Sequence, residues 1–140
     1  MNEVTNFFGI DVSMGTFDVS TADQKHFQYS NDVEGYRRLL NLLDDQSHCV
    51  MEATGAYHQK LATWLYSHTS KVSVVNKIVI KRFAQMRLRL ANNDKADADM
   101  IRQYAEAEKP EVWSPPQEYV MQACEINGLV MLLIRQRTAL

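Results

Sequence analysis

Four carboxylates, spread over three places in the chain, have the residue types and spacing of a divalent-metal site. Asp11 closes a long apolar run and Glu52 closes a shorter one, so each is expected at the end of a buried strand. Asp94 and Asp97 are three residues apart and share one face if their segment is helical. A buried, charged carboxylate is costly unless it is paired or bound to a cation, and carboxylate oxygens suit Mg²⁺. We therefore predict that Asp11, Glu52, Asp94 and Asp97 are catalytic metal ligands, although a helix cap or a surface charge explains each acid taken alone.

The chemistry that such a site favours is phosphoryl transfer. Two cations about 3.5 to 4 Å apart can stabilise the attacking and leaving oxygens of an in-line displacement. Other chemistries have less support, because the four histidines show no metal-ligand spacing and Ser13 and Ser20 have no evident histidine base. A phosphate ester is therefore the expected substrate.

The charged residues are segregated along the chain. The net charge is only -2, but residues 53–93 contain no Asp or Glu and carry seven Lys and Arg residues. A basic block between acidic segments suggests a polyanion drawn toward a metal, while a solvated helix face is the simpler alternative. We predict steeply salt-dependent nucleic-acid binding by the cations of the expected basic helix: Lys77, Lys81, Arg82, Arg87 and Arg89.

Length and composition indicate one globular domain. The 140 residues are 46% hydrophobic and 23% charged, which is ordinary for a folded soluble protein. The longest apolar run, Leu129–Ile134, is too short to cross a bilayer, and the N-terminus has no signal-peptide pattern, so we predict a cytoplasmic protein. Cys49 and Cys124 are far apart and outside any CxxC pattern, which argues against a disulfide framework or a zinc site.

Apolar periodicity and turn residues predict the elements that position the acids. The expected basic helix should turn Ile78, Phe83, Met86 and Leu90 inward. The expected order is three strands (4–12, 17–20, 25–29), a helix (34–43), a strand (48–51), a helix (56–68), a strand (71–75), the basic helix (77–90) and an acidic helix (94–107).

This order predicts an α/β domain with a ribonuclease H-like (RuvC-like) mixed five-stranded sheet flanked by helices. The first strand would lie at the centre, with the fourth and fifth strands parallel to it. Strands one and four would then be neighbours about 4.8 Å apart, so that Asp11 and Glu52 reach a common point. The helix of Asp94 and Asp97 has only to pack across that edge.

The last part of the chain differs from the rest. We predict that residues 1–109 form the catalytic domain and that residues 110–140 form a proline-containing break and a helical linker or dimerisation segment. The expected helix over 117–140 is apolar on more than one side, which favours a homodimer or higher oligomer, or a chain that continues into a further domain. Docking of this helix on its own domain is the competing interpretation.

The segments that carry the acids, together with the start of the basic helix, resemble the amino-terminal RuvC-like DEDD domain of insertion-sequence 110 family transposases, a family that includes Piv-like recombinases. The similar order and spacing extend from residue 6 to about 107. The matching pieces are Gly9–Ser13, Met51–Tyr57, Val75–Asn76 with Phe83–Ala84, and Asn93–Ala98.

The resemblance implies that Asp11, Glu52, Asp94 and Asp97 are the DEDD tetrad, acting with Mg²⁺ or Mn²⁺ in DNA strand cleavage and exchange. It also implies a structured guide RNA encoded by the element and a second domain that supplies a serine nucleophile. This chain would then be an incomplete catalytic half-site, inactive alone. Met14, Lys77 and Asn92–Asn93 stand where the family commonly has Lys, Pro and Lys-Thr, which weakens inferences about phosphate contacts at those positions.

Three alternatives remain open at this point. The stretch Gly9–Thr16 also resembles the first phosphate loop of actin-like ATPases, although no second phosphate loop or adenosine-binding glycine pair is visible. A non-catalytic DNA-docking or dimerisation module would make the acids incidental. A stand-alone RuvC-like Holliday-junction nuclease would need no second domain.

Overall fold

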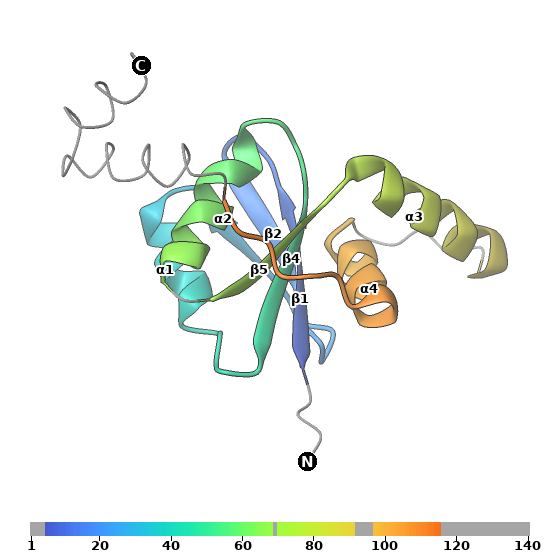
Figure 1. Cartoon of the computed structure of the whole chain (residues 1–140), viewed down its shortest axis with the longest axis horizontal. Helices are drawn as coiled ribbons and strands as arrows, with labels where there is room; N and C mark the ends of the chain where they lie inside the picture. Colours follow the sequence, from blue (N-terminus) through green and yellow to red (C-terminus); the bar gives the residue numbers. More distant parts are fainter. Residues whose placement is uncertain (1–4, 69, 92–96, 116–140) are drawn as a thin grey trace.

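The sheet of this protein is mixed, and its first strand lies at the centre. The computed structural model describes residues 5–68, 70–91 and 97–115 (Figure 1). The strand order is β3-β2-β1-β4-β5, with β1 antiparallel to β2 and parallel to β4, and β4 parallel to β5. The predicted α/β, ribonuclease H-like arrangement is confirmed. The strands are β1 (Asn6–Val12), β2 (Thr16–Ser20), β3 (His26–Ser30), β4 (Ser47–Glu52) and β5 (Lys71–Val75).

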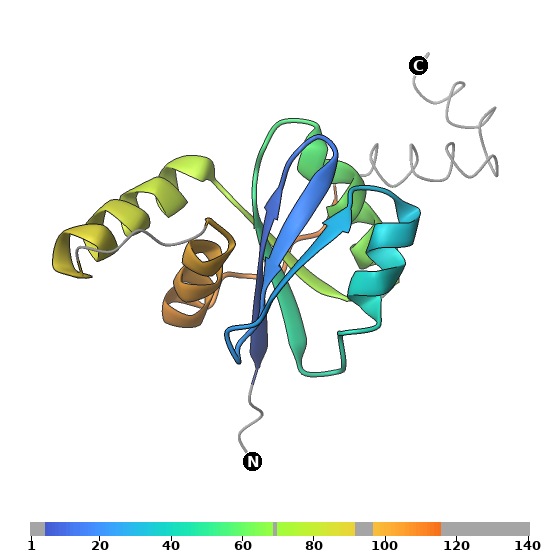
Figure 2. The same ribbon diagram turned by 180° about the vertical axis from the view of Figure 1, so that it is seen from behind.

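Helices lie on both sides of the sheet (Figures 1 and 2). Helices α1 (Val33–Leu40) and α2 (Tyr57–Ser67) lie on one face, and α3 (Lys77–Ala91) and α4 (Asp97–Glu108) lie on the other. Successive side chains of β1 point to opposite faces of the sheet, so this strand contributes to two hydrophobic cores. Phe8 and Ile10 pack in the core under α1 and α2, whereas Phe7 packs with Ile101 of α4. Asp11 therefore lies on the α4 face.

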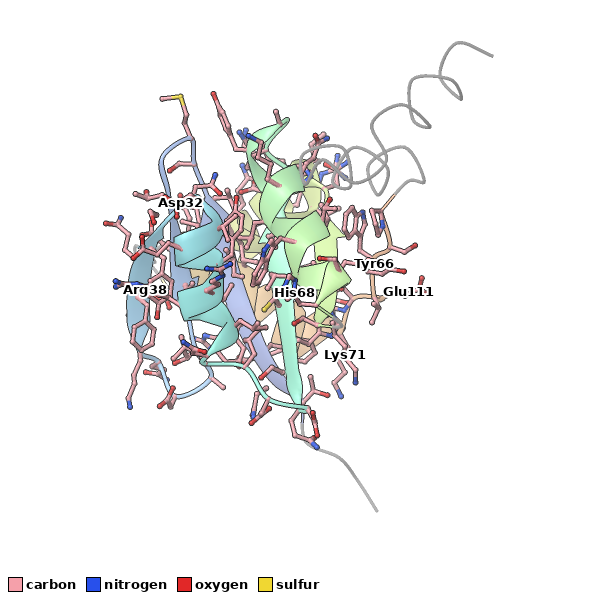
Figure 3. All side chains as sticks on the ribbon, turned by 90° about the vertical axis from the view of Figure 1, so that its left-hand side faces the viewer. Asp32, Arg38, Tyr66, His68, Lys71 and Glu111 are labelled. Carbon is pink, nitrogen blue, oxygen red and sulfur yellow. The ribbon has the colours of Figure 1, made fainter. Side chains whose placement is uncertain are left out.

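The turns beside the end of β1 are tied together by Asn31. Its side-chain amide donates to the backbone carbonyls of Ser13, in the β1–β2 turn, and Tyr57, at the start of α2. The buried Tyr36 hydroxyl donates to the Asn31 side-chain oxygen at 2.7 Å. Next to it, Asp32 caps α1 by accepting from the Gly35 backbone N–H (Figure 3). These bonds hold three loops at the end of the sheet where Asp11 lies.

The segment after α4 crosses the β5 edge from one helical layer to the other (Figures 1 and 3). The Ser73 hydroxyl donates to the Glu111 carbonyl, and the Trp113 backbone N–H donates to the Val72 carbonyl at 2.6 Å. The Trp113 ring then meets Tyr66 of α2 edge-on, with centroids 6.5 Å apart. The segment thereby covers an edge strand. The expected helix over 117–140 lies outside the described residues.

The predicted orientation of α3 is wrong in part. Phe83 is buried and meets Tyr104 of α4 edge-on, but Ile78 and Met86 are 55% and 53% exposed. The reason is that α3 leaves the carboxyl end of β5 and runs out past α4, so only a narrow stripe of the helix is covered (Figures 1 and 2). The side chain of Leu90 lies outside the described part. No helix in the described residues is long and apolar enough to span a membrane.

Candidate active site

Asp11 and Glu52 lie side by side at the carboxyl ends of two neighbouring parallel strands. The register pairs Gly9 with Val50 and Ile10 with Met51, so Asp11 comes next to Glu52 along the same two strands. Ile10 and Met51 point to the core under α1 and α2, and alternation puts both acids on the opposite face. The structure therefore brings together the two acids that the sequence placed at strand ends.

Two further carboxylates surround Asp11. Asp97 is the first residue of α4, and its charge raises the pKa of both Asp11 and Glu52. Asp18 is the direct cross-strand partner of Asp11 in the β1–β2 hairpin, and it accepts a hydrogen bond from Gln28 at 2.9 Å. Sequence reasoning missed Asp18. The short turn at 13–15 was the available signal, because it pairs Val12 with Phe17 and so Asp11 with Asp18.

The acids repel one another in a partly desolvated place. Burial is the largest cause of the raised pKa of Asp11, followed by the charges of Asp97 and Asp18. Burial also raises the pKa of Glu52, with Asp11 as the next cause. Lys77, at the start of α3, acts in the opposite direction on both. Within the described ranges no ion pair involves Asp11, Glu52 or Asp97, so a bound cation would relieve the negative charge that Lys77 leaves uncompensated.

The raised pKa values of Asp11 and Glu52 predict that the contribution of these two acids to folding stability falls as pH rises. Between the ordinary pKa values of Asp11 and Glu52, 3.8 and 4.5, and their raised values, the folded chain binds more protons than the unfolded chain. The free energy of unfolding contributed by these acids therefore decreases with pH across that window. Urea denaturation from about pH 4 to 7 should show a difference between the wild type and the double variant Asp11→Asn/Glu52→Gln that grows in favour of the variant. A difference that stays constant over this range contradicts the raised pKa values.

A buried hydroxyl lies just beyond Glu52. The Thr54 Oγ1 atom has no hydrogen-bond partner among the described residues. The Thr54 backbone N–H donates to His58 Nδ1 at 3.0 Å, and burial lowers the pKa of His58, which favours the neutral ring. His58 is thus a buried structural histidine of the β4–α2 connection. The Thr54 hydroxyl is therefore an unsatisfied polar group near the carboxyl end of β4.

Basic side chains line the helix that starts at this edge. Lys77, Lys81, Arg82 and Arg87 are exposed on α3, and the Arg87 guanidinium lies 5.1 Å from the centre of the Phe83 ring. The side chain of Arg89 lies outside the described residues. Because Lys77 interacts electrostatically with Asp11 and Glu52, the basic helix begins at the acids and extends away from them.

Part of the predicted tetrad cannot be placed. Asp94 lies outside the described residues, and within those residues no group of three or more His, Cys, Asp and Glu side chains is arranged to hold a metal ion. Asp99, two residues after Asp97, is bonded instead to Ser20 and His26 of β2 and β3. The metal-ligand assignment of Asp11, Glu52, Asp94 and Asp97 therefore stays a prediction.

Comparison with known families identifies the family of this chain. Residues 8–140 match the family model for DEDD transposases of insertion sequence 110, which is described as a transposase. The chain belongs to the insertion-sequence 110 family of DEDD transposases. The resemblance carried by Gly9–Ser13 and Met51–Tyr57 is thereby confirmed. Membership of this family also favours the transposase interpretation over the actin-like ATPase one.

Two curated relatives carry the name pilin gene-inverting protein. The protein from Moraxella lacunata is 33% identical over 118 residues, and the one from Moraxella bovis is 32% identical over 118 residues. Each alignment covers 78% of this chain and 37% of the relative. The chain thus spans little more than a third of the length of these family members.

Proposed function

We propose that this chain is the metal-dependent catalytic domain of a DNA transposase or site-specific recombinase. The observation that carries the proposal is the side-by-side placement of Asp11 and Glu52 at the ends of β1 and β4, where both also feel the charge of Asp97 at the start of α4. Family membership supports the same reaction class, and the relatives named for pilin gene inversion support DNA as the substrate. An element-encoded guide RNA, proposed on family grounds, and a homodimer or higher oligomer, proposed from the apolar pattern of residues 117–140, complete the proposal.

The described acids have the oxygen donors that suit a divalent cation, and Asp94, which lies outside the described residues, would have to complete the set. Carboxylate oxygens are hard ligands, and burial and mutual repulsion destabilise the charged forms of Asp11 and Glu52. No ion pair with a described cation compensates these charges. Asp11, Glu52, Asp97 and, from outside the described residues, Asp94 would hold Mg²⁺ or Mn²⁺. The metal would supply charge stabilisation to the oxygens of a DNA phosphate under attack.

The side chains of this chain have three roles in the proposed reaction. Asp11 and Glu52 place their carboxylate oxygens at the ends of two paired strands, which limits the movement of these oxygens. Lys77 adds positive charge beside Asp11 and Glu52, where it offsets part of their repulsion. The exposed cations of α3 attract the phosphate backbone without reading its sequence, and so place a strand near the acids.

Mn²⁺ titration by calorimetry tests the metal site in this chain. We expect saturable binding by the wild type, loss of that binding in Asp11→Ala, and no heat from ATP with Mg²⁺. If Asp11→Ala binds Mn²⁺ as tightly as the wild type does, the assignment of Asp11 as a metal ligand is wrong. Binding of ATP would support the phosphate-loop interpretation of Gly9–Thr16 instead.

We expect the exposed cations of α3 to carry most of the DNA affinity. In the triple variant Lys81→Gln/Arg82→Gln/Arg87→Gln, the slope of log K against log salt should fall by about 0.9 per lost phosphate contact, and the affinity by roughly 10- to 100-fold. Fluorescence anisotropy with a labelled duplex over a salt series measures both quantities.

A second triple variant that loses the same charge elsewhere shows whether DNA affinity depends on the position of the cations or only on the net charge of the protein. Lys25→Gln/Arg37→Gln/Arg38→Gln removes three exposed cations associated with β3 and α1, away from the α3 layer. This variant should keep nearly the wild-type slope. Equal losses in the two triple variants would show that DNA responds to net charge and not to α3.

A further inference from the structure

Helix α4 brings Asp97 to the centre of the sheet, and it lies unusually close to β1. A Cβ atom built on Gly9 would come within 2.2 Å of the Ala98 carbonyl oxygen and 2.4 Å of the Arg102 backbone nitrogen. Gly9 therefore allows backbone-to-backbone packing two residues before Asp11. Ile101 and Ala105 add apolar contact on the same face of the sheet. Apolar contact selects the buried face of a helix, but directional bonds restrain its exact rotation more tightly.

Directional contacts that can fix this rotation come from β2 and β3. Asp99 Oδ1 accepts a hydrogen bond from the Ser20 hydroxyl at 2.5 Å and lies 2.6 Å from His26 Nε2. Ser20 is fully buried and is paired with His26 across the two strands. A helical residue near Asp97 is thus bonded to the two strands beyond β1.

Arg102 closes the network one turn later on α4. Its Nε donates to the Ser20 hydroxyl oxygen at 2.9 Å, so Ser20 accepts from Arg102 and donates to Asp99. Its Nη1 lies 2.9 and 3.0 Å from the two carboxylate oxygens of Glu106, which orients the buried guanidinium. Two successive turns of α4 are therefore attached to one serine of β2.

We propose that Ser20, Asp99 and Arg102 are positioning residues that hold α4 in the rotation that places Asp97 beside Asp11 and Glu52. The inference rests on the proposed metal-dependent function, and it gives a role to polar residues outside the proposed set of metal ligands. Loss of the network should leave the sheet folded and let the start of α4 turn or shift. The measured consequence is weaker metal binding.

The test compares two substitutions at one position. Asp99→Ala removes the acceptor of Ser20, whereas Asp99→Asn keeps an acceptor oxygen but also removes the charge. Calorimetric Mn²⁺ titration should show affinity about 10-fold or more below wild type for Asp99→Ala, which is the range for residues that orient metal ligands. Asp99→Asn should recover most of it. Glu108→Ala, an exposed acid on the same helix, is the control and should bind as wild type does.

Ser20→Ala is the second variant, because it removes both bonds without changing charge. It should weaken Mn²⁺ binding as Asp99→Ala does, at temperatures where circular dichroism shows both variants folded. Wild-type affinity in folded Ser20→Ala, or equal losses in Asp99→Ala and Asp99→Asn, overturns the positioning role alone. A wild type whose Mn²⁺ binding does not depend on Asp11 overturns the proposed function and this inference with it.

Discussion

Asp11→Asn is expected to abolish Mn²⁺ binding and, in the same protein, to stabilise the metal-free chain. The wild type should gain about 2.7 kcal/mol of unfolding free energy when Mn²⁺ is present at 100 times its dissociation constant. The variant should gain nothing. Without metal, the variant should be more stable than wild type by roughly 0.2 to 1 kcal/mol, the cost of like charges directly opposite on paired strands.

The two effects have one physical cause. Asp11 faces Asp18 across the hairpin and lies beside Glu52, so its charge is unfavourable until a cation is bound. Urea denaturation with and without Mn²⁺ measures both effects, and the order of stability of the two proteins should reverse when the metal is added. An ordinary structural carboxylate behaves differently, since its removal lowers stability in both conditions.

Asp45→Asn is the matched control for this experiment. Asp45 is exposed and precedes β4, at the opposite end of the strand from Glu52. It carries the same charge change and should respond to Mn²⁺ as the wild type does. A destabilised metal-free Asp11→Asn, or one that Mn²⁺ stabilises normally, would contradict the view that Asp11 is the central ligand.

The part of the site built from strands could be predicted from the sequence. Asp11 and Glu52 each close an apolar run, and the order of the predicted elements is that of a ribonuclease H-like fold, in which the first and fourth strands are neighbours. Alternation then decides the face on which both acids lie. The strand ends and the alternation of side chains are local properties, and the strand neighbours follow from the predicted order of elements. Both can therefore be inferred from the sequence.

The part of the site built from helix packing could not be predicted in the same way. Ile78 and Met86 have the spacing of a covered stripe, but how far α3 extends past α4 depends on tertiary structure. Likewise, Ser20 and Asp99 are 79 residues apart, and the local sequence around neither residue predicts the hydrogen bond between them. The pairing of Asp11 with Asp18 was within reach, because it follows from the length of one turn.

Gly9→Ala is expected to destabilise the fold strongly and to weaken the metal site. The added Cβ would lie 2.2 and 2.4 Å from two backbone atoms of α4, and backbone atoms cannot rotate out of the way as a side chain can. The helix must move off β1, at a cost of about 1 to 3 kcal/mol or more. Because Asp97 begins that helix, Mn²⁺ affinity should fall together with the free energy of unfolding.

Gly15→Ala separates this clash from the general effect of replacing glycine. A Cβ at Gly15 meets nothing within 4 Å, so that variant should stay within about 0.5 kcal/mol of the wild type. Urea denaturation of the two variants and Mn²⁺ titration of each give the comparison. If Gly9→Ala matched Gly15→Ala in both measurements, α4 would not rest on β1, and the packing that brings Asp97 to Asp11 would be wrong. The expected gap between the two alanine variants is therefore a direct measure of how closely α4 and the central strand are held.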